Sequence, residues 1–420
     1  MKIKTKELDY SKVMELPRPE HKFPKKQNPL FSFFLRAFSE FELREVDFKY
    51  TKKNMEAAGD GPWLVLMNHC SFLDIKIVSK IMYPKPYSIV STDDGFVGRE
   101  WMMRNAGCIP TKKFIADIGL FSDISYAINK NKSSVVIYPE ASYSFDGTTT
   151  KFQKGIGLIL KRLGVPVVMI TTEGSFTRDP LYNNLLKRDV KVKATVECLF
   201  SKEDLKNVSL EQIDEALEKA FDLDYFKWQK DNKVVTKEPF RADCLNRILY
   251  KCCECGTEGM MEGKGTTIKC KKCGKEYEMD EYGCLHAKDG NTRFSHIPDW
   301  YAWERNEVRK AIDDGSYLLK VDVDIAVMVD HNSIYKVGNG VLKHDVNGFV
   351  LDGCEGKLHY EQKADTSYSL YSDYYWYEIG DVICIGNTDC LYYCFPKQGD
   401  VVAKTRMAVE EIYKKSHYKK

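Results

Sequence analysis

The chain has 420 residues, long enough for two to four domains of roughly 150 residues each. Its 63 Lys and Arg nearly balance 61 Asp and Glu, and the net charge of +2 argues against a protein that binds nucleic acid over most of its surface. Hydrophobic residues make up 43% and charged residues 30%, a globular composition that excludes a largely disordered chain.

Neither a membrane-spanning segment nor a secretory signal is visible in the sequence. No continuous apolar stretch approaches the roughly 18 residues that a spanning helix needs. The first residues lack an apolar core followed by a small-residue cleavage site, so we expect a cytoplasmic protein. Five of the 14 Cys lie between Cys252 and Cys273, and in a reducing compartment this clustering indicates metal ligation rather than disulfides.

Residues 1–45 form a basic segment that ends in an amphipathic stretch. Eight Lys or Arg and four acidic residues lie within 1–26. The apolar residues that then recur at helical spacing are Leu30, Phe31, Phe34, Leu35 and Phe38. A Phe stripe beside basic residues is typical of a helix on an anionic membrane, so we expect a peripheral protein on the inner face of the membrane. The alternative is that the stripe packs on the following domain.

Short apolar runs alternate with longer helical stretches within residues 46–230. Strands are predicted at 63–67, 134–138 and 165–170, and helices near 74–82, 115–130 and 152–163. This alternation indicates an α/β domain with a mostly parallel sheet. Ser209, with Gln212 three residues later, predicts a capping box for a helix over 209–222, and a charged connector follows at 224–249.

The first chemical motif directly follows the strand at 63–67. It reads Asn68-His69-Cys70-Ser71-Phe72-Leu73-Asp74, which places His69 on a loop and Asp74 in the first helical turn. A carboxylate that holds one imidazole nitrogen leaves the other free to take a proton from a hydroxyl. The pair therefore predicts the base half of a triad without an enzyme nucleophile. A hydrogen-bonded structural histidine is the alternative.

Three further blocks follow along the chain. Tyr138-Pro139-Glu140-Ala141-Ser142-Tyr143-Ser144 comes after another buried strand, so Glu140 lies at the sheet edge where ligand sites of α/β proteins gather. Gly107-Cys108-Ile109-Pro110-Thr111-Lys112-Lys113 has small residues ahead of paired cations, which suits anion binding. The last block is Val165-Pro166-Val167-Val168.

With these four blocks in order, residues 62–200 resemble the glycerolipid acyltransferase family of the 1-acylglycerol-3-phosphate acyltransferase type. The family has a histidine and an aspartate separated by four residues, matched here by His69 and Asp74. Its Phe-Pro-Glu-Gly-Thr-Arg-Ser block corresponds to 138–144, and a Gly-x-Ile-x-x-x-Arg-like block corresponds to 107–113. The resemblance covers about a third of the chain.

The resemblance implies transfer of an acyl group from a thioester of coenzyme A or acyl carrier protein to the hydroxyl of a lysophospholipid, 1-acyl-sn-glycerol-3-phosphate above all. His69 would be the general base and Asp74 its orienting partner, and backbone N–H groups of their loop would stabilise the oxyanion. The residues expected to shape or contact the substrate sites are Asn68, Ser71, Gly107, Thr111, Lys112, Lys113, Pro139, Glu140 and Ser142.

Two positions depart from the family pattern. Ala141 stands where the family has Gly, and Tyr143 stands where it has an Arg that contacts the acceptor phosphate. The lysines that would substitute as point charges are Lys112, Lys113, Lys151 and Lys154. The alternatives are a different hydroxyl acceptor, such as another lyso-lipid or a non-phosphate alcohol, and a non-catalytic lipid- or protein-binding adaptor.

Residues 248–286 form a separate small unit built on two Cys-x-x-Cys hooks. The predicted ligands are Cys252, Cys255, Cys270 and Cys273, with Cys253 as the spare. Each hook brings two thiolates to one tetrahedral zinc, and the Gly after each second Cys permits the turn. Four thiolates leave no open position, so the zinc would be structural, and the unit resembles a zinc ribbon. Acidic residues offset its lysines, so we expect no nucleic-acid binding.

Residues 290–420 are expected to form an all-β domain with one closing helix. Strands are predicted at 316–329, 340–352, 357–362, 376–386 and 389–395, and a helix at 400–415. Turns are predicted at Asn339-Gly340, Asn347-Gly348 and Gly386-Asn387. The architecture is similar to the pleckstrin-homology-like class. Nine acidic residues against three Lys between 340 and 395 argue against docking of this face on anionic lipid heads.

Overall fold

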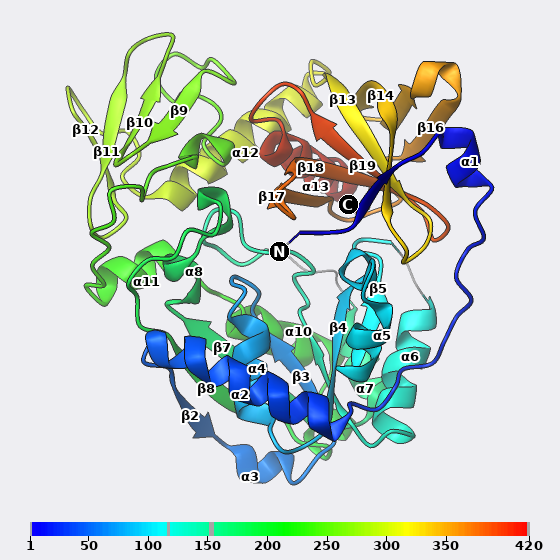
Figure 1. The fold of residues 1–420 in the computed structure, drawn as a ribbon. Helices are drawn as coiled ribbons and strands as arrows, with labels where there is room; N and C mark the ends of the chain where they lie inside the picture. The colour runs from blue at the N-terminus through cyan, green and yellow to red at the C-terminus, as the bar shows by residue number, and fades with distance from the viewer. Residues whose placement is uncertain (1, 116–117, 151–154, 418–420) are drawn as a thin grey trace.

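Three β-sheets organise the part of the chain that the structure describes (Figure 1). The computed structural model describes residues 2–115, 118–150 and 155–417. The first sheet contains β2 (Lys49–Lys53), β3 (Leu64–Met67), β4 (Tyr87–Thr92), β5 (Cys108–Thr111), β6 (Ser134–Ile137), β7 (Val167–Glu173) and β8 (Lys193–Phe200). Its order is β2-β8-β7-β3-β6-β4-β5, and paired strands are parallel except for β7 with β8. The expected α/β domain with a mostly parallel sheet is confirmed.

Helices cover both faces of this sheet. They include α2 (Pro29–Glu45), α4 (Asp74–Met82), α6 (Ile118–Asn129), α7 (Ile156–Leu163) and α10 (Leu210–Ala220). Val65 and Met67 of β3 belong to the hydrophobic cluster of α2 and α4, whereas Leu64 and Leu66 belong to that of α6, α7 and α10. Successive side chains of a strand point to opposite faces, so a strand between two helical layers is apolar throughout.

Shorter helices connect these elements. They are α1 (Tyr10–Met14), α3 (Met55–Ala58), α5 (Glu100–Asn105), α8 (Ser175–Arg178), α9 (Asp204–Asn207), α11 (Tyr225–Asp231) and the 3-10 turns η1 (Asp93–Phe96), η2 (Leu181–Asn183), η3 (Leu245–Arg247) and η4 (Cys354–Gly356). The capping box of α10 is present, because Ser209 Oγ accepts from the N–H of Gln212 and Gln212 Oε1 accepts from the N–H of Ser209. The connector predicted at 224–249 contains α11, whose cap Asp224 accepts from the N–H of Lys227 at 2.8 Å.

The second sheet is antiparallel and belongs to the cysteine unit. Its strands are β9 (Met261–Lys264), β10 (Thr267–Cys270), β11 (Glu276–Met279) and β12 (Leu285–Ala287). It packs on α12 (Ile297–Asp313), where the rings of Tyr277 and Trp300 are 5.1 Å apart.

The third sheet consists of two antiparallel meanders joined through β13 and β19. Its strands are β13 (Leu319–Met328), β14 (Ile334–Asp345), β15 (Gly348–Gly353), β16 (Leu358–Lys363), β17 (Tyr371–Trp376), β18 (Gly380–Gly386) and β19 (Leu391–Pro396), followed by α13 (Val402–His417). The expected C-terminal β-sheet with a closing helix is therefore confirmed, although residues 290–420 also contain the helix α12. The pleckstrin-homology-like classification stays a prediction. β1 (Thr5–Glu7) adds to this sheet in parallel with β14, so the start of the chain lies in the C-terminal domain rather than with the rest of 1–45.

The turn predicted at Asn339-Gly340 is wrong. Both residues lie inside β14, opposite Asp324 and Val323 of β13. A Cβ on Gly340 would lie 2.2 Å from the carbonyl oxygen of Asp352, so glycine here permits close approach of β15. The turns at Asn347-Gly348 and Gly386-Asn387 do separate strands.

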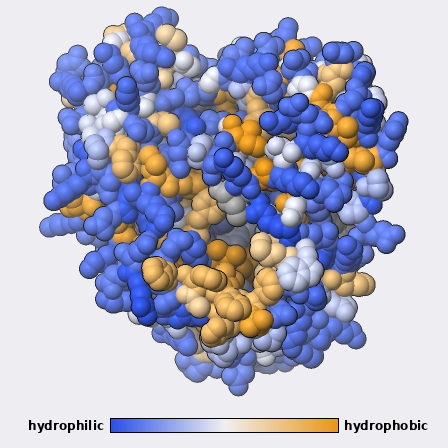
Figure 2. Space-filling view, viewed as in Figure 1, coloured by the Kyte–Doolittle hydropathy of each residue, from blue (hydrophilic) through white to orange (hydrophobic). Residues whose placement is uncertain are grey.

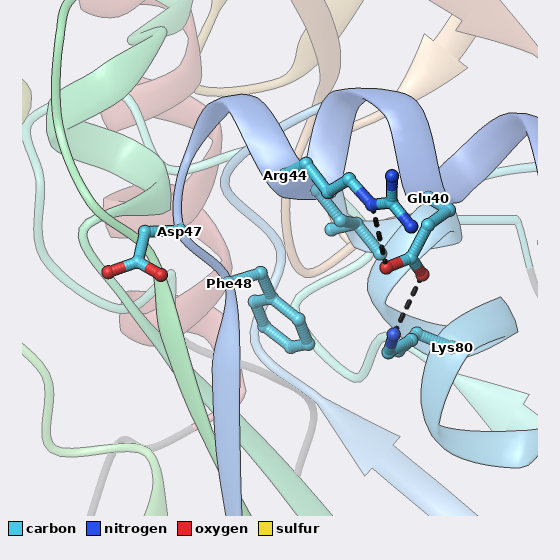
Figure 3. A pocket seen from close by; sticks show the side chains of 6 residues that line it. Glu40, Arg44, Asp47, Phe48 and Lys80 are labelled. Carbon is cyan, nitrogen blue, oxygen red and sulfur yellow. Dashed lines mark hydrogen bonds and ion pairs between the residues drawn. The ribbon is translucent and has the colours of Figure 1, made fainter.

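Leu43 and ion pairs, rather than Phe side chains, dock α2 on α4. The buried side chains of α2 are Ser32, Ser39 and Leu43. Glu40 pairs with Lys80 of α4 at 2.7 Å, and this hydrogen bond lowers the pKa of Glu40 to about 2. Figure 3 shows Glu40 between Lys80 and Arg44 beside a pocket of about 150 Å³. This pocket lies at the C-terminal end of α2, and none of the predicted site residues lines it.

The outer face of α2 is apolar and exposed. Its exposed large side chains are Leu30, Phe33, Phe34, Phe38 and Phe41. They recur at three- and four-residue spacing and therefore share one side of the helix, where Figure 2 shows apolar side chains gathered. Phe31 and Leu35, predicted in the same stripe, are instead half-buried, and Phe31 contacts the ring of Trp101. The alternative in which the stripe packs on the following domain is therefore wrong for the exposed side chains. None of the helices in the described ranges is long and apolar enough to cross a membrane.

Candidate active site

His69 and Asp74 meet at the carboxyl end of β3. His69 lies on the loop after the strand, and Asp74 is the first residue of α4, as predicted. Nδ1 of His69 lies 2.9 Å from Oδ2 of Asp74. The same oxygen accepts from the backbone N–H groups of Cys70 at 3.1 Å and Ser71 at 3.3 Å. The carboxylate is thus fixed by the loop and in turn fixes the imidazole.

Two tyrosine rings confine the imidazole of His69. The ring centroids of Tyr138 and Tyr143 lie 4.2 Å and 4.0 Å from it, with interplanar angles of 33° and 23°. Two rings at that distance cannot occupy the same face, so the imidazole is sandwiched and accessible only along its edge. At that edge, Nε2 has no hydrogen-bond partner within the part of the chain that the structure describes.

The electrostatic setting of His69 favours the neutral ring. Burial lowers its pKa, the hydrogen bond and charge of Asp74 oppose this change, and the positive charge of Lys113 lowers the pKa further. A neutral imidazole that donates Nδ1–H to Asp74 presents a lone pair on Nε2. The arrangement can therefore accept a proton from a hydroxyl near that nitrogen.

Glu140 ties the second motif to the His69 loop. Its carboxylate, 2% exposed, accepts from the N–H groups of His69 at 3.0 Å and Thr150 at 2.8 Å. Burial raises the pKa of Glu140 to about 8. Because the N–H groups of His69, Cys70 and Ser71 all donate to carboxylates, the expectation that this loop stabilises an oxyanion is wrong for these three groups.

The side chains of Asn68 and Ser71 hold the His69 loop in place through hydrogen bonds. Oδ1 of Asn68 accepts from the N–H of Thr172 at 2.8 Å, and its Nδ2 donates to the hydroxyl of Thr172 at 2.9 Å. Oγ of Ser71 donates to Asp179 at 2.6 Å. Both side chains are at most 1% exposed and fix the loop, as expected for residues that shape it, while direct contact with a substrate stays a prediction.

The block at 107–113 runs the length of β5. Gly107 precedes the strand, at the sheet edge opposite to His69, because β5, β4, β6 and β3 are parallel. Its φ is +84°, and a Cβ there would lie 2.7 Å from the carbonyl oxygen of Tyr87. Gly107 therefore serves backbone packing, which corrects its assignment to the substrate site. Thr111 ends the strand at the same edge as His69.

The two lysines after β5 have different surroundings. Lys112 pairs with Asp93 at 3.2 Å, and Asp93 also contacts His331 of the C-terminal domain at 2.6 Å. Lys113 lies over the ring of Tyr371 at 4.6 Å, and in the described part of the chain no hydrogen bond or ion pair engages its ammonium. Of these two lysines, Lys113 is the one whose positive charge lowers the pKa of His69. The other two lysines considered, Lys151 and Lys154, lie outside the described residues.

The remaining residues of 138–144 are buried or strained. Pro139 is buried. Ala141, which stands where the family has Gly, adopts a φ of +52°, a left-handed conformation that costs a non-glycine residue about 1–2 kcal/mol. Oγ of Ser142 donates to the carbonyl oxygen of Tyr143 at 3.1 Å and accepts from Arg406 of α13 at 3.0 Å. Sequence reasoning missed Arg406, because nothing near it in the sequence resembles a binding motif.

The four predicted cysteines form a cluster. The Sγ atoms of Cys252, Cys255, Cys270 and Cys273 all lie within 4.8 Å of one another. The Sγ separations are 3.7 Å for Cys252–Cys273 and 3.8 Å for Cys255–Cys270. Four thiolates at 2.3 Å from a tetrahedral zinc lie about 3.8 Å apart, so the cluster fits zinc. Cys253 points instead to the hydroxyl of Tyr277 at 3.2 Å.

The first domain is similar in sequence to known acyltransferases. Residues 46–173 match the family model described as Acyltransferase, as the resemblance predicted for this part of the chain. The 1-acyl-sn-glycerol-3-phosphate acyltransferase BAT2, chloroplastic, of Brassica napus is 31% identical over 122 residues, which are 28% of this chain and 35% of that protein. The chloroplastic 1-acyl-sn-glycerol-3-phosphate acyltransferase LPAT1 of Arabidopsis thaliana is 28% identical over 137 residues, 30% of this chain and 38% of that protein.

The matches are partial. The chain spans only 35% and 38% of the lengths of these two relatives. The crystal structure of the 1-acyl-sn-glycerophosphate (LPA) acyltransferase PlsC from Thermotoga maritima aligns at a TM-score of 0.36 and 19% identity, covering 45% of this chain and 76% of that chain. The matched segment 46–173 reaches neither the cysteine unit nor the C-terminal sheet.

Proposed function

We propose that this protein is an O-acyltransferase that moves a fatty acyl group from acyl-CoA or acyl carrier protein to the free hydroxyl of a lysophospholipid, 1-acyl-sn-glycerol-3-phosphate above all. One observation carries the proposal: Asp74 holds His69, whose Nε2 has no partner among the described residues, inside the segment 46–173 that matches the Acyltransferase family. The names of the two plant relatives support the choice of acceptor.

The mechanism needs no nucleophile from the protein. Nε2 of His69 takes the proton of the acceptor hydroxyl while the oxygen attacks the thioester carbonyl. When the tetrahedral intermediate collapses, the C–S bond breaks and the leaving thiolate takes the proton from His69. Asp74 orients the ring and stabilises the transient imidazolium, as the third member of a catalytic triad does.

The test is release of free thiol from an acyl thioester upon addition of an acceptor. Acyl-CoA and acyl-acyl carrier protein are each supplied with lysophosphatidate, other lyso-lipids and simple alcohols. The proposal predicts that lysophosphatidate gives the fastest release. Fast release with another acceptor would keep the chemistry and change the substrate, and no release with any acceptor would favour the non-catalytic adaptor.

The same proposal includes peripheral binding to a membrane through α2. The exposed apolar face of this helix points away from the protein, with Phe38 and Phe41 75% and 80% exposed. Rows of exposed aromatic side chains are unfavourable in water and favourable in the interfacial region of a bilayer. A lysophospholipid is itself found in membranes, so an enzyme that rests on the bilayer meets its acceptor there.

Zinc is the cofactor that we propose for the cysteine cluster. Cys252, Cys255, Cys270 and Cys273 would hold it with a closed shell of thiolates, so the metal would stabilise the small unit and take no part in acyl transfer. The four-stranded sheet alone has a small hydrophobic core, so such a crosslink would add to the stability that it gains by packing on α12.

A further inference from the structure

The closing helix α13 places Arg406 against the second motif of the α/β domain. Its Nη1 donates to Oγ of Ser142 at 3.0 Å, and its Nη2 donates to Oγ1 of Thr150 at 3.1 Å. The N–H of Thr150 donates to the carboxylate of Glu140, which also accepts from the N–H of His69. A guanidinium from the end of the chain is thus linked to the candidate base through Thr150 and Glu140.

Arg406 is nearly inaccessible to solvent but only partly engaged. It is 3% exposed and lies over the ring of Phe145 at 4.4 Å. Its Nε pairs with Glu410 at 3.2 Å, and Glu410 also pairs with Arg305 of α12 at 2.6 Å. Within the described part of the chain these contacts engage three of the five N–H groups of Arg406 and leave one on each terminal nitrogen.

A second cation approaches from the α/β domain. Lys113 is partly buried, and burial lowers its pKa, with repulsion from Arg406 as a smaller contribution in the same direction. The charge of Lys113 in turn lowers the pKa of His69. Burial raises the pKa of Asp373 to about 6, and the positive charge of Lys113 opposes this rise. Lys113 and Arg406 are therefore near enough to repel each other, and Lys113 is near enough for its charge to act on His69.

We propose that Arg406 binds the phosphate of the acceptor, so that the C-terminal domain completes the active site. This inference rests on the proposed acyl transfer. A guanidinium presents parallel N–H donors that match two phosphate oxygens, whereas Tyr143, at the motif position where the family has Arg, carries no charge. Preference for a phosphate-bearing acceptor would then depend on a residue 264 positions after Ser142.

The experiment compares two acceptors that differ only in the phosphate. A short-chain lysophosphatidate and the matching monoacylglycerol are assayed with the full-length wild type, Arg406→Gln and Arg406→Lys. The matched control is Arg305→Gln, which removes the other arginine on Glu410 but has no contact with Ser142 or Thr150. The measured quantity is the ratio of kcat/KM for the two acceptors, which does not depend on the fraction of folded protein.

Arg406→Gln is expected to lower this ratio about 10- to 100-fold, mainly through KM for lysophosphatidate, because a charge-assisted hydrogen bond is lost. Arg406→Lys is expected to lower the ratio less, and Arg305→Gln less than threefold. An unchanged ratio in Arg406→Gln, or in Arg406→Lys if the first variant does not fold, would overturn the proposal. Equal losses on both acceptors would also overturn it, since they would make Arg406 a structural tie.

Binding separates this inference from the proposed function. Short-chain lysophosphatidate is titrated calorimetrically into His69→Ala and into His69→Ala with Arg406→Gln. Weaker binding in the double variant supports the role of Arg406 even if the wild type transfers no acyl group. Equal binding contradicts that role even if transfer occurs.

Discussion

The carboxylate of Asp74 serves both the ring of His69 and the backbone of the loop that carries it. In Asp74→Asn a neutral amide replaces the carboxylate, so no charged oxygen remains to accept from His69, Cys70 and Ser71. The imidazolium of the transition state also loses its counter-charge. We expect kcat for acyl transfer to fall about 100-fold or more, with KM within a few fold of the wild type. Steady-state kinetics beside a circular dichroism spectrum measures this. A kcat within threefold of the wild type would contradict the role of Asp74.

The pH dependence of the rate follows from the surroundings of His69. Burial lowers its pKa below the ordinary 6.5, so the neutral base persists to lower pH, and the rate should fall only as pH drops through the lowered value. In Asp74→Asn the influence that raises this pKa is removed, so the residual activity should keep its acid limb at still lower pH. The pH profiles of the wild type and the variant are measured with the same acceptor, so ionisation of the acceptor affects both profiles equally. An acid limb at higher pH in Asp74→Asn than in the wild type would show that the group whose titration limits the rate is not His69.

The site residues differ in how far the sequence could predict them. His69 and Asp74 are close in the chain, and a strand followed by a helix start is enough to bring them together. Gly107 was misassigned, because a glycine needed for close backbone approach looks the same in sequence as one that lines an anion site. Arg406 reaches Ser142 only through the docking of α13, which no local pattern records.

At the scale of elements, α2 gives a direct prediction about membrane binding. Replacing Phe38 and Phe41 by Ser removes two large side chains from the exposed face of the helix without touching its buried side, which consists of Ser32, Ser39 and Leu43. We expect binding to vesicles that contain anionic lipids to weaken about tenfold or more, because each buried aromatic ring contributes about 1.5–3 kcal/mol. Flotation assays measure the bound fraction.

The control for this experiment is Arg44→Ser, which changes an exposed side chain elsewhere on α2. It should bind vesicles within a few fold of the wild type. Transfer to a short-chain acceptor in solution should be retained in both variants. Unchanged vesicle binding by the Phe variant would refute the assignment of this face.

The cysteine unit supports a prediction about metal. The purified protein should carry one zinc per chain, and Cys270→Ser should lose it together with about 5 °C or more of Tm, since binding of structural zinc contributes to folding. Cys253→Ser is the matched control, because this thiol faces Tyr277 and lies outside the cluster. Elemental analysis measures the zinc content, and thermal melts measure the Tm. Full zinc content in Cys270→Ser, or none in the wild type, would contradict the site.

Elements with a strong local signal were predictable, and those without one were not. The helix predicted at 74–82 has the same bounds in the structure, and the predicted capping box correctly indicated the start of α10. In contrast, β2 reads Lys-Tyr-Thr-Lys-Lys, with no apolar period, and becomes a strand only because it pairs with β8 at the edge of the sheet. The predicted strand 340–352 proved to span parts of β14 and β15, which are joined at Asn347-Gly348.

At the scale of the whole molecule, one hydrophobic cluster reaches across all three domains, beside the two clusters on the faces of the α/β sheet. A single cluster contains Cys70 and Phe176 of the α/β domain, Tyr277 of the cysteine unit, and Tyr374 and Met407 of the C-terminal domain. We therefore expect one cooperative thermal transition in calorimetry, because exposing any one part would expose the apolar surface of another. Two well-separated transitions, with acyl transfer lost only at the second, would contradict this view.

The division into domains was the least predictable feature from the sequence. The pattern separated 1–45 from 290–420, but β1 pairs with β14 and His331 contacts Asp93. Pairing between distant segments leaves no trace in local periodicity, so the sequence showed the parts but not that the C-terminal domain lies against the candidate site.

The most direct test of acyl transfer by His69 is to measure, by mass spectrometry, the phosphatidate formed from lysophosphatidate and acyl-CoA. Wild-type protein and His69→Ala are compared. We expect the wild type to form product and His69→Ala to lose about 100-fold or more of this activity, with the same circular dichroism spectrum. Product formation by His69→Ala at more than a few per cent of the wild-type rate would contradict the central role given to His69.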